Sequence, residues 1–168
     1  MGEIIFMNNI NKETPNRTRK EVKSLEELRA IAEVFLSSLA QKEAKETATV
    51  VGLSGDLGAG KTAFTKCIAS ILGITEIITS PTFILEKIYI IPRGSMLGER
   101  FTKLIHIDAY RLESGREMKA LDWGALLLDG HNLILLEWPE KVSEAMPKDT
   151  INISFEYIGE SVRTITLE

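Results

Sequence analysis

One ten-residue stretch constrains this chain more than any other: Leu53–Thr62, LSGDLGAGKT. It follows an apolar run with the composition of a strand and precedes a helical pattern of apolar residues. Its residues Gly55, Gly60, Lys61 and Thr62 match the pattern G-x-x-x-x-G-K-[ST]. A plain glycine turn between strand and helix is the alternative, but four fixed positions match by chance about once in a few hundred tries. The stretch therefore predicts a phosphate-binding loop.

The chemistry of phosphate binding explains this spacing. Glycines allow successive backbone N–H groups to turn inward around phosphate oxygens, and the following helix directs its positive dipole end at the same anion. Lys61 can neutralise the β- and γ-phosphates, and the Thr62 hydroxyl can ligate Mg²⁺. The predicted cofactor-binding residues of the loop are Gly55, Asp56, Leu57, Gly58, Ala59, Gly60, Lys61, Thr62 and Ala63.

The sequence favours ATP over GTP. A guanine-specific GTPase carries N/T-K-x-D on a later strand and D-x-x-G at its switch, and neither pattern occurs after the loop. This preference depends on an absence, because the chain shows no positive code for adenine.

Two carboxylates follow apolar runs and complete a predicted metal site. Glu137 ends the run LILLE, and Asp108 ends HID. Charges at the carboxyl ends of buried strands face the ligand crevice of an α/β sheet, although strand-end carboxylates are also common without any function. With Thr62 they form a predicted Mg²⁺ set of one hydroxyl and two carboxylates. Asp108, Glu137 and Lys61 are the predicted catalytic residues.

The segment TSPTF, Thr79–Phe83, places two hydroxyls where they can sense a γ-phosphate or its attacking water. We include Thr82 among the cofactor-binding residues for this reason, although a plain turn explains the segment almost as well. His106 is expected to be a packed or hydrogen-bonded residue rather than a base. Cys67, on the helix behind the loop, is expected to be a core thiol.

The remaining pattern predicts one α/β domain: a single-domain P-loop NTPase fold with a mixed central sheet flanked by helices. Ser24 and Glu27 form a capping box at the start of a first helix, and Gly73 stands where the second helix should stop. The runs FILEKIYII and FTKLIHID read as strands joined by PRGSMLGER, at 92–100. A C-terminal β-hairpin is predicted from TINISFEYI and SVRTITLE. Residues 1–18 form a polar N-terminal lead-in, and residues 19–168 form the P-loop domain.

Composition limits the possible settings. The chain of 168 residues carries a net charge of −4, so no global attraction to nucleic acid or to an anionic membrane is expected. A single cysteine excludes an internal disulfide framework and a cysteine-based zinc cluster. No apolar stretch has membrane-spanning length and the first residues do not form a signal peptide, so a cytoplasmic location is predicted.

Taken together, GDLGAGKT, SPTF, HIDAYRL and LLEWPEK, in this order and spacing, resemble the bacterial TsaE (formerly YjeE) family. The resemblance covers residues 20 to 168. It implies a Mg²⁺-dependent ATPase of the tRNA threonylcarbamoyladenosine (t6A) pathway that acts with the TsaD and TsaB subunits and reaches tRNA only indirectly. In that pathway TsaD modifies adenosine 37 of tRNAs that read codons beginning with A, and TsaE resets the complex between rounds.

The resemblance also implies residue roles. Thr62 and Glu137 would bind Mg²⁺, Asp108 would be important for hydrolysis, and Ser80-Pro81-Thr82 would form a switch-like segment. The adenine side would be contacted near Ser24–Glu26. Two departures are visible: Ala63 stands where the family often has a hydroxyl residue, and the connection at 92–100 is longer than usual, as an inert extension or a contact to the partners.

Two other functions use the same phosphate loop. A small-molecule kinase would need a second substrate pocket and an arginine-bearing lid, for which residues 92–100 are the one candidate. A nucleotide-gated binding module would show no meaningful turnover. Phosphate release with and without the partner subunits separates the three.

Overall fold

The computed structural model describes residues 18–159 and 162–168. The predicted lead-in at residues 1–18 therefore lies outside the described residues, except for Thr18, which begins the first strand. The strands are β1 (Thr18–Val22), β2 (Thr49–Gly55), β3 (Glu86–Ile90), β4 (Lys103–Asp108), β5 (Asn132–Glu137), β6 (Ile151–Tyr157) and β7 (Arg163–Leu167). The helices are α1 (Leu25–Ala40), α2 (Lys61–Ile71) and α3 (Trp123–Leu127), with the 3₁₀ segments η1 (Gly115–Leu121) and η2 (Pro139–Ala145).

All seven strands form one mixed sheet in the order β1-β7-β6-β2-β5-β4-β3. The four inner strands β6, β2, β5 and β4 run parallel to one another, whereas β1, β7 and β3 pair antiparallel with their neighbours. The predicted α/β fold with a mixed sheet and a C-terminal β6–β7 hairpin is confirmed. The strand β1 was not predicted, because its TRKEV sequence is almost wholly polar.

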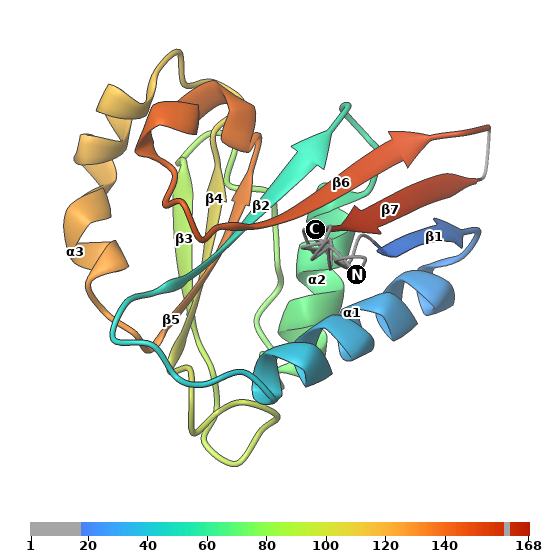
Figure 1. The fold of residues 1–168 in the computed structure, drawn as a ribbon, viewed down its shortest axis with the longest axis horizontal. Coiled ribbons are helices and arrows are strands. Elements are labelled where there is room, and N and C mark those ends of the chain that lie inside the picture. Colours follow the sequence, from blue (N-terminus) through green and yellow to red (C-terminus); the bar gives the residue numbers. More distant parts are fainter. Residues whose placement is uncertain (1–17, 160–161) are drawn as a thin grey trace, which may run out of the picture.

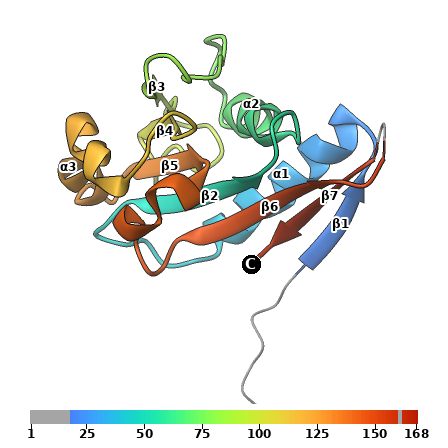
Figure 2. The ribbon, with the colours of Figure 1, turned by 90° about the horizontal axis from the view of Figure 1, so that it is seen from above.

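The sheet is covered on both faces, and each face has its own apolar core (Figures 1 and 2). Helices α1 and α2 pack on one face through side chains such as Phe35, Phe64 and Ile68. On the other face α3 and the 3₁₀ segments pack through Trp123 and Val142. The run in β5 is buried at every residue, as expected for a central strand with both faces covered.

The ends of the first two helices follow the predicted signals. The Ser24 hydroxyl accepts a hydrogen bond from the Glu27 N–H at 3.1 Å, while the Glu27 carboxylate accepts from the backbone of Lys23 rather than of Ser24. Helix α2 stops at Gly73, whose φ of 77° suits glycine. Leu25, the first residue of α1, is 67% exposed, whereas Leu28, Ala32, Phe35, Leu36 and Leu39 form the buried face of the helix.

The segment before β3 is a turn, not the predicted strand. The carbonyl of Pro81 accepts hydrogen bonds from the N–H groups of Ile84 and Leu85, and Leu85 has a φ of 65°. The strand therefore begins only at Glu86. Phe83 projects from this turn and is 82% exposed.

The connection at 92–100 joins the end of β3 to the start of β4, as predicted. It lies at the opposite end of the sheet from the glycine loop, below α1 in Figure 1. Arg100 donates hydrogen bonds to the carbonyls of Leu39, Lys42 and Glu43, which end α1 or follow it. This connection therefore holds the C-terminal end of α1.

Candidate functional site

The glycine loop lies between β2 and α2, and three of its glycines, Gly55, Gly58 and Gly60, have positive φ. Gly55 has a φ of 132°, and a Cβ there would lie 2.2 Å from the carbonyl oxygen of Phe155. Gly60 has a φ of 117° and precedes the first residue of α2. These conformations favour glycine, and in phosphate-binding loops they allow backbone N–H groups to turn toward an anion at the N-terminus of the following helix.

Lys61 is the first residue of α2 and is only 4% exposed. Its ammonium donates hydrogen bonds to the carbonyls of Gly55 and Asp56, the latter at 2.9 Å, and lies 3.9 Å from the centroid of the Trp138 ring. Burial lowers the pKa of Lys61 from its ordinary value, against the attraction of Glu137 and other carboxylates. The loop itself thus holds a cation beside the cavity, at a cost in desolvation.

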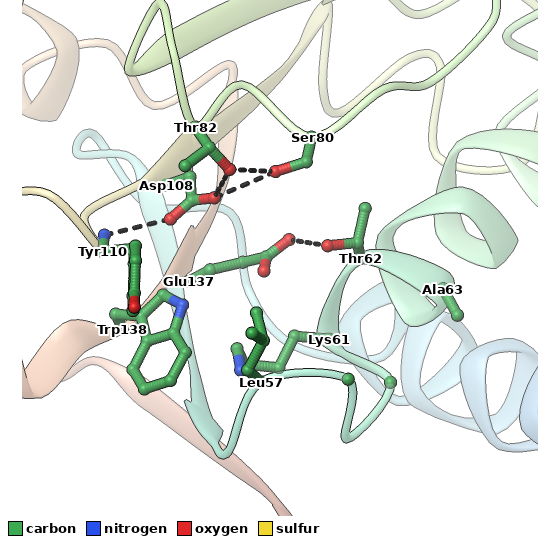
Figure 3. Close-up of a pocket in the computed structure, with 12 residues that line it drawn as sticks. Leu57, Lys61, Thr62, Ala63, Ser80, Thr82, Asp108, Tyr110, Glu137 and Trp138 are labelled. Atoms are coloured by element: carbon green, nitrogen blue, oxygen red, sulfur yellow. Dashed lines mark hydrogen bonds between the residues drawn. The ribbon is translucent and has the colours of Figure 1, made fainter.

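Thr62 and Glu137 meet across the site (Figure 3). The Thr62 hydroxyl donates to Oε1 of Glu137 at 2.8 Å. Glu137 ends β5 and pairs in register with Asp108, which ends the neighbouring parallel strand β4. The structure therefore brings together the three side chains of the predicted hydroxyl and two-carboxylate set.

Asp108 is surrounded by hydrogen-bond donors. The hydroxyls of Ser80 and Thr82 both donate to its Oδ2, at 2.9 and 2.5 Å, and the backbone N–H of Tyr110 donates to Oδ1 at 3.0 Å. The turn that replaces the predicted strand at Phe83 is what carries the two hydroxyls to this carboxylate (Figure 3).

A cavity of about 430 Å³ joins these groups. Of the predicted residues, it is lined by Leu57, Gly58, Gly60, Lys61, Thr62, Ala63, Thr82, Asp108 and Glu137. The three others do not line it: Gly55 and Asp56 turn their carbonyls to Lys61, and Ala59 is buried beside a second cavity.

Three further residues line the cavity: Ser80, Tyr110 and Trp138. The Tyr110 and Trp138 rings lie 5.1 Å apart between centroids, and Trp138 holds a φ of 63° directly after Glu137. The aromatic residues were not among the predicted site residues, although both stand within two positions of a predicted carboxylate. That adjacency is the signal that could have found them.

A second cavity of about 310 Å³ adjoins the first and shares Gly58, Gly60 and Ala63 with it. Its other side is formed by the residues around the start of α1, including Ser24 and Leu25, and by Arg163. The two cavities together form a depression on both sides of the glycine loop.

The residues present suit a nucleotide phosphate chain and a magnesium ion. Inward-turned backbone N–H groups, a helix N-terminus and a buried ammonium are the groups that hold phosphate. Hydroxyl and carboxylate oxygens are the hard ligands that Mg²⁺ prefers, and Thr62 and Glu137 supply them within one hydrogen bond of each other.

The parallel strands, the glycine loop between β2 and α2 and the strand-end carboxylate form a mixed α/β fold with the arrangement expected of a P-loop NTPase. The family model for "Threonylcarbamoyl adenosine biosynthesis protein TsaE" matches residues 22–165. The chain belongs to the TsaE family.

Individual relatives agree with this assignment. The chain is 38% identical over 117 residues to the TsaE protein of Bacillus subtilis, and the aligned residues are 70% of this chain and 67% of that protein. It is 40% identical over 123 residues to the TsaE protein of Treponema pallidum, and the aligned residues are 73% of this chain and 83% of that protein. Among solved structures, the crystal structure of Bacillus subtilis YdiB matches with a TM-score of 0.62 and 29% identity over 90% of this chain and 84% of that one.

None of the helices in residues 18–159 and 162–168 is long and apolar enough to cross a membrane.

Proposed function

We propose that this protein is a Mg²⁺-dependent ATPase that acts with the TsaD and TsaB subunits in the threonylcarbamoylation of adenosine 37 of tRNAs reading ANN codons. TsaE family proteins take part in t6A biosynthesis. The observation that carries the ATPase proposal is the single cavity in which the glycine loop, the Thr62–Glu137 pair and Asp108 converge.

The phosphates of ATP would lie against the backbone of the glycine loop. Lys61 would exchange its carbonyl partners Gly55 and Asp56 for the β- and γ-phosphates, because an ammonium gains more from an anion than from a neutral oxygen. The base and ribose would enter the adjoining cavity near Ser24 and Leu25. This position agrees with the adenine side that the family resemblance implies.

A bound magnesium ion would neutralise the charge that develops on the phosphate oxygens. Thr62 would offer it a lone pair while the hydroxyl proton of Thr62 stays hydrogen-bonded to Glu137, and Glu137 and Asp108 would hold the ion or its water ligands. Asp108 would orient the attacking water. Its Oδ2 is shared by Ser80 and Thr82, so rearrangement of this switch-like segment around a γ-phosphate would free that oxygen.

A small-molecule kinase remains the second candidate, and one observation disfavours it. The only predicted lid, residues 92–100, lies at the other end of the sheet and holds the end of α1. It does not reach the cavity. Leu57 lines the cavity and is 77% exposed, and Phe83, next to Thr82 in the chain, is 82% exposed. Exposed apolar side chains at these positions instead suit a function that depends on partner proteins.

The test is phosphate release by the purified chain, alone and with the TsaD and TsaB subunits, with Lys61→Ala as the matched control. We expect slow release alone, faster release with the partners, and none above background for the control. The same reactions with γ-labelled ATP and a metabolite extract would reveal a kinase. Label transfer to a metabolite without partner stimulation would contradict the proposal, and tight ATP binding without any release would indicate a binding module.

A further inference from the structure

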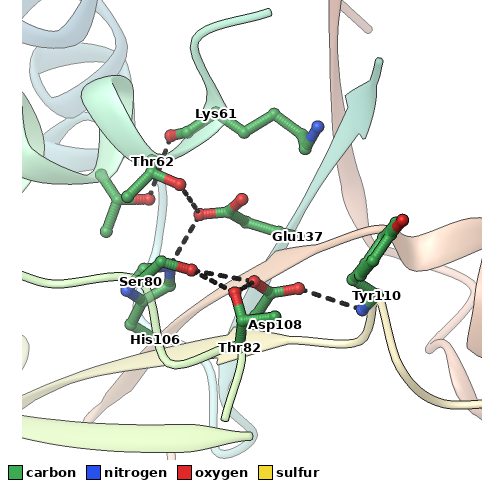
Figure 4. Close-up of polar contacts among 9 residues, drawn as sticks. Lys61, Thr62, Ser80, Thr82, His106, Asp108, Tyr110 and Glu137 are labelled. Atoms are coloured by element: carbon green, nitrogen blue, oxygen red, sulfur yellow. Dashed lines mark hydrogen bonds and ion pairs between the residues drawn. The ribbon is translucent and has the colours of Figure 1, made fainter. Parts of the chain in front are cut away.

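His106 lies directly beneath the candidate site and is fully buried. Its Nε2 is 2.8 Å from Oε1 of Glu137, the same oxygen that accepts the Thr62 hydroxyl (Figure 4). Its Nδ1 is buried and has no hydrogen-bond partner among the described residues. Among the residues that the structure describes, Glu137 is therefore the one polar partner of this ring.

The position of His106 excludes direct contact with a ligand in the cavity. On β4 it stands two residues before Asp108, so both side chains point to the same face of the sheet. It is opposite Leu135, two residues further into the sheet than the Asp108–Glu137 pair. His106 does not line the cavity. Its effect must act through Glu137.

The hydrogen bond has a preferred direction. A carboxylate oxygen accepts hydrogen bonds, so the Nε2–H group of His106 donates a hydrogen bond to Oε1. Nδ1 then remains a buried acceptor without a partner, which is costly compared with an apolar side chain of similar size. The neighbours of His106, Leu104 and Leu135, are buried and apolar, so leucine would suit this position on β4 if the side chain had no role in the site.

We propose that His106 is a positioning residue that fixes the carboxylate of Glu137 for Thr62 and the metal. Two donors on Oε1 hold the carboxylate in one rotation, with Oε1 directed at the Thr62 proton. The lone pairs of the Thr62 hydroxyl are then directed away from Glu137, and Oε2 has no hydrogen-bond partner among the described side chains. This inference rests on the proposed function, since it assigns His106 to the magnesium site of the ATPase.

The test compares His106→Leu, which removes the donor, with His106→Gln, whose amide N–H can reach Glu137. Tyr89→Phe is the matched control: it removes another buried, unpartnered polar atom from the adjacent strand β3 without touching the carboxylate. For each variant, Mn²⁺ affinity in the presence of ATP is measured by electron paramagnetic resonance. ATP affinity in EDTA and the urea unfolding midpoint are measured alongside it.

We expect His106→Leu to weaken Mn²⁺ binding roughly 10- to 100-fold, the usual effect of losing a group that orients a metal ligand. ATP affinity in EDTA should change less than about twofold, because Lys61 and the glycine loop are untouched. His106→Gln should recover Mn²⁺ affinity to within about threefold of the wild type, and Tyr89→Phe should match it. If His106→Leu does not fold, His106→Asn replaces it, since the shorter amide cannot span the distance.

Three results would overturn the inference: wild-type Mn²⁺ affinity in His106→Leu, an equal loss of ATP affinity in EDTA, or a Gln variant as weak as the Leu variant. The second would indicate a general structural role. Failure of the proposed function looks different, because the wild-type protein itself would then bind no Mn²⁺ with ATP, and both proposals would fall.

Discussion

The replacement Arg100→Ala tests whether the connection at 92–100 is a structural element. Arg100 donates to the carbonyl of Leu39 in the last turn of α1 and to those of Lys42 and Glu43 just beyond it. A cation at this end of a helix also complements the helix dipole. If the connection were an inert extension, removal of the Arg100 side chain would leave the free energy of unfolding unchanged.

The magnitude follows from the three bonds. The half-buried bond to Leu39 joins a charged donor to a carbonyl and contributes about 1.5–3 kcal/mol. The two exposed bonds add roughly 0.5 kcal/mol each. Part of this is offset because Nε of Arg100 is buried without a partner and its removal relieves that cost. The expected loss is about 2 kcal/mol of unfolding free energy, or about 4–8 °C in Tm.

Urea and thermal unfolding of the wild type, Arg100→Ala and Arg100→Lys measure this loss. Lysine keeps the charge but cannot form the forked contacts, so it should lose about half as much. ATP binding by the folded variants should equal that of the wild type, since the cavity lies at the opposite end of the sheet. A loss below about 0.5 kcal/mol for Arg100→Ala would refute the capping role, and the contact surface for partners would become the better explanation.

Four further predictions concern single side chains. Lys61→Ala should weaken ATP binding at least about 100-fold in calorimetry, because the polyphosphate loses its main protein cation; near-normal affinity would contradict the loop assignment. Asp108→Ala should bind ATP normally but lower partner-stimulated phosphate release roughly 10²- to 10³-fold, whereas unchanged turnover would refute its role. Glu137→Ala should weaken ATP binding in Mg²⁺ but not in EDTA, so an unchanged metal requirement would count against it. Burial raises the pKa of Glu86 above its ordinary 4.5, so the folded state favours the protonated carboxyl, and this contribution to stability is lost as pH rises through the raised pKa. Glu86→Gln should therefore raise the urea midpoint at neutral pH and not below pH 4.5. Equal midpoints of the variant and the wild type at neutral pH would contradict this.

The parts of the fold that were predictable from sequence are those fixed by local pattern. The glycine loop, the helix ends at Ser24 and Gly73 and the buried strand before Glu137 each depend on a few neighbouring residues, and the structure has them where they were expected. The convergence of Thr62, Asp108 and Glu137 also followed, because the ends of parallel strands meet at one edge of a sheet.

The remaining features depend on contacts between distant segments. Polar residues formed β1 because β7 offered an unpaired edge, which no local pattern records. Phe83 lies outside β3 because the Pro81 carbonyl closes a turn around it. The link from His106 to Glu137 depends on the register of two strands, and Arg100 finds its partners 57 to 61 residues earlier in the chain.

The pairing of β1 with β7 has a consequence for how the domain reaches its final state. Thr18 lies opposite Leu167, so the strand nearest the start of the described chain seals the hairpin formed by its last strands. Pairing of two strands so far apart in the sequence is slow, because the chain loses the entropy of bringing them together before their contacts form. During folding, the outer edge of β7 would be exposed until β1 paired with it. A variant that lacks β1 would leave this edge free to pair with strands of other chains.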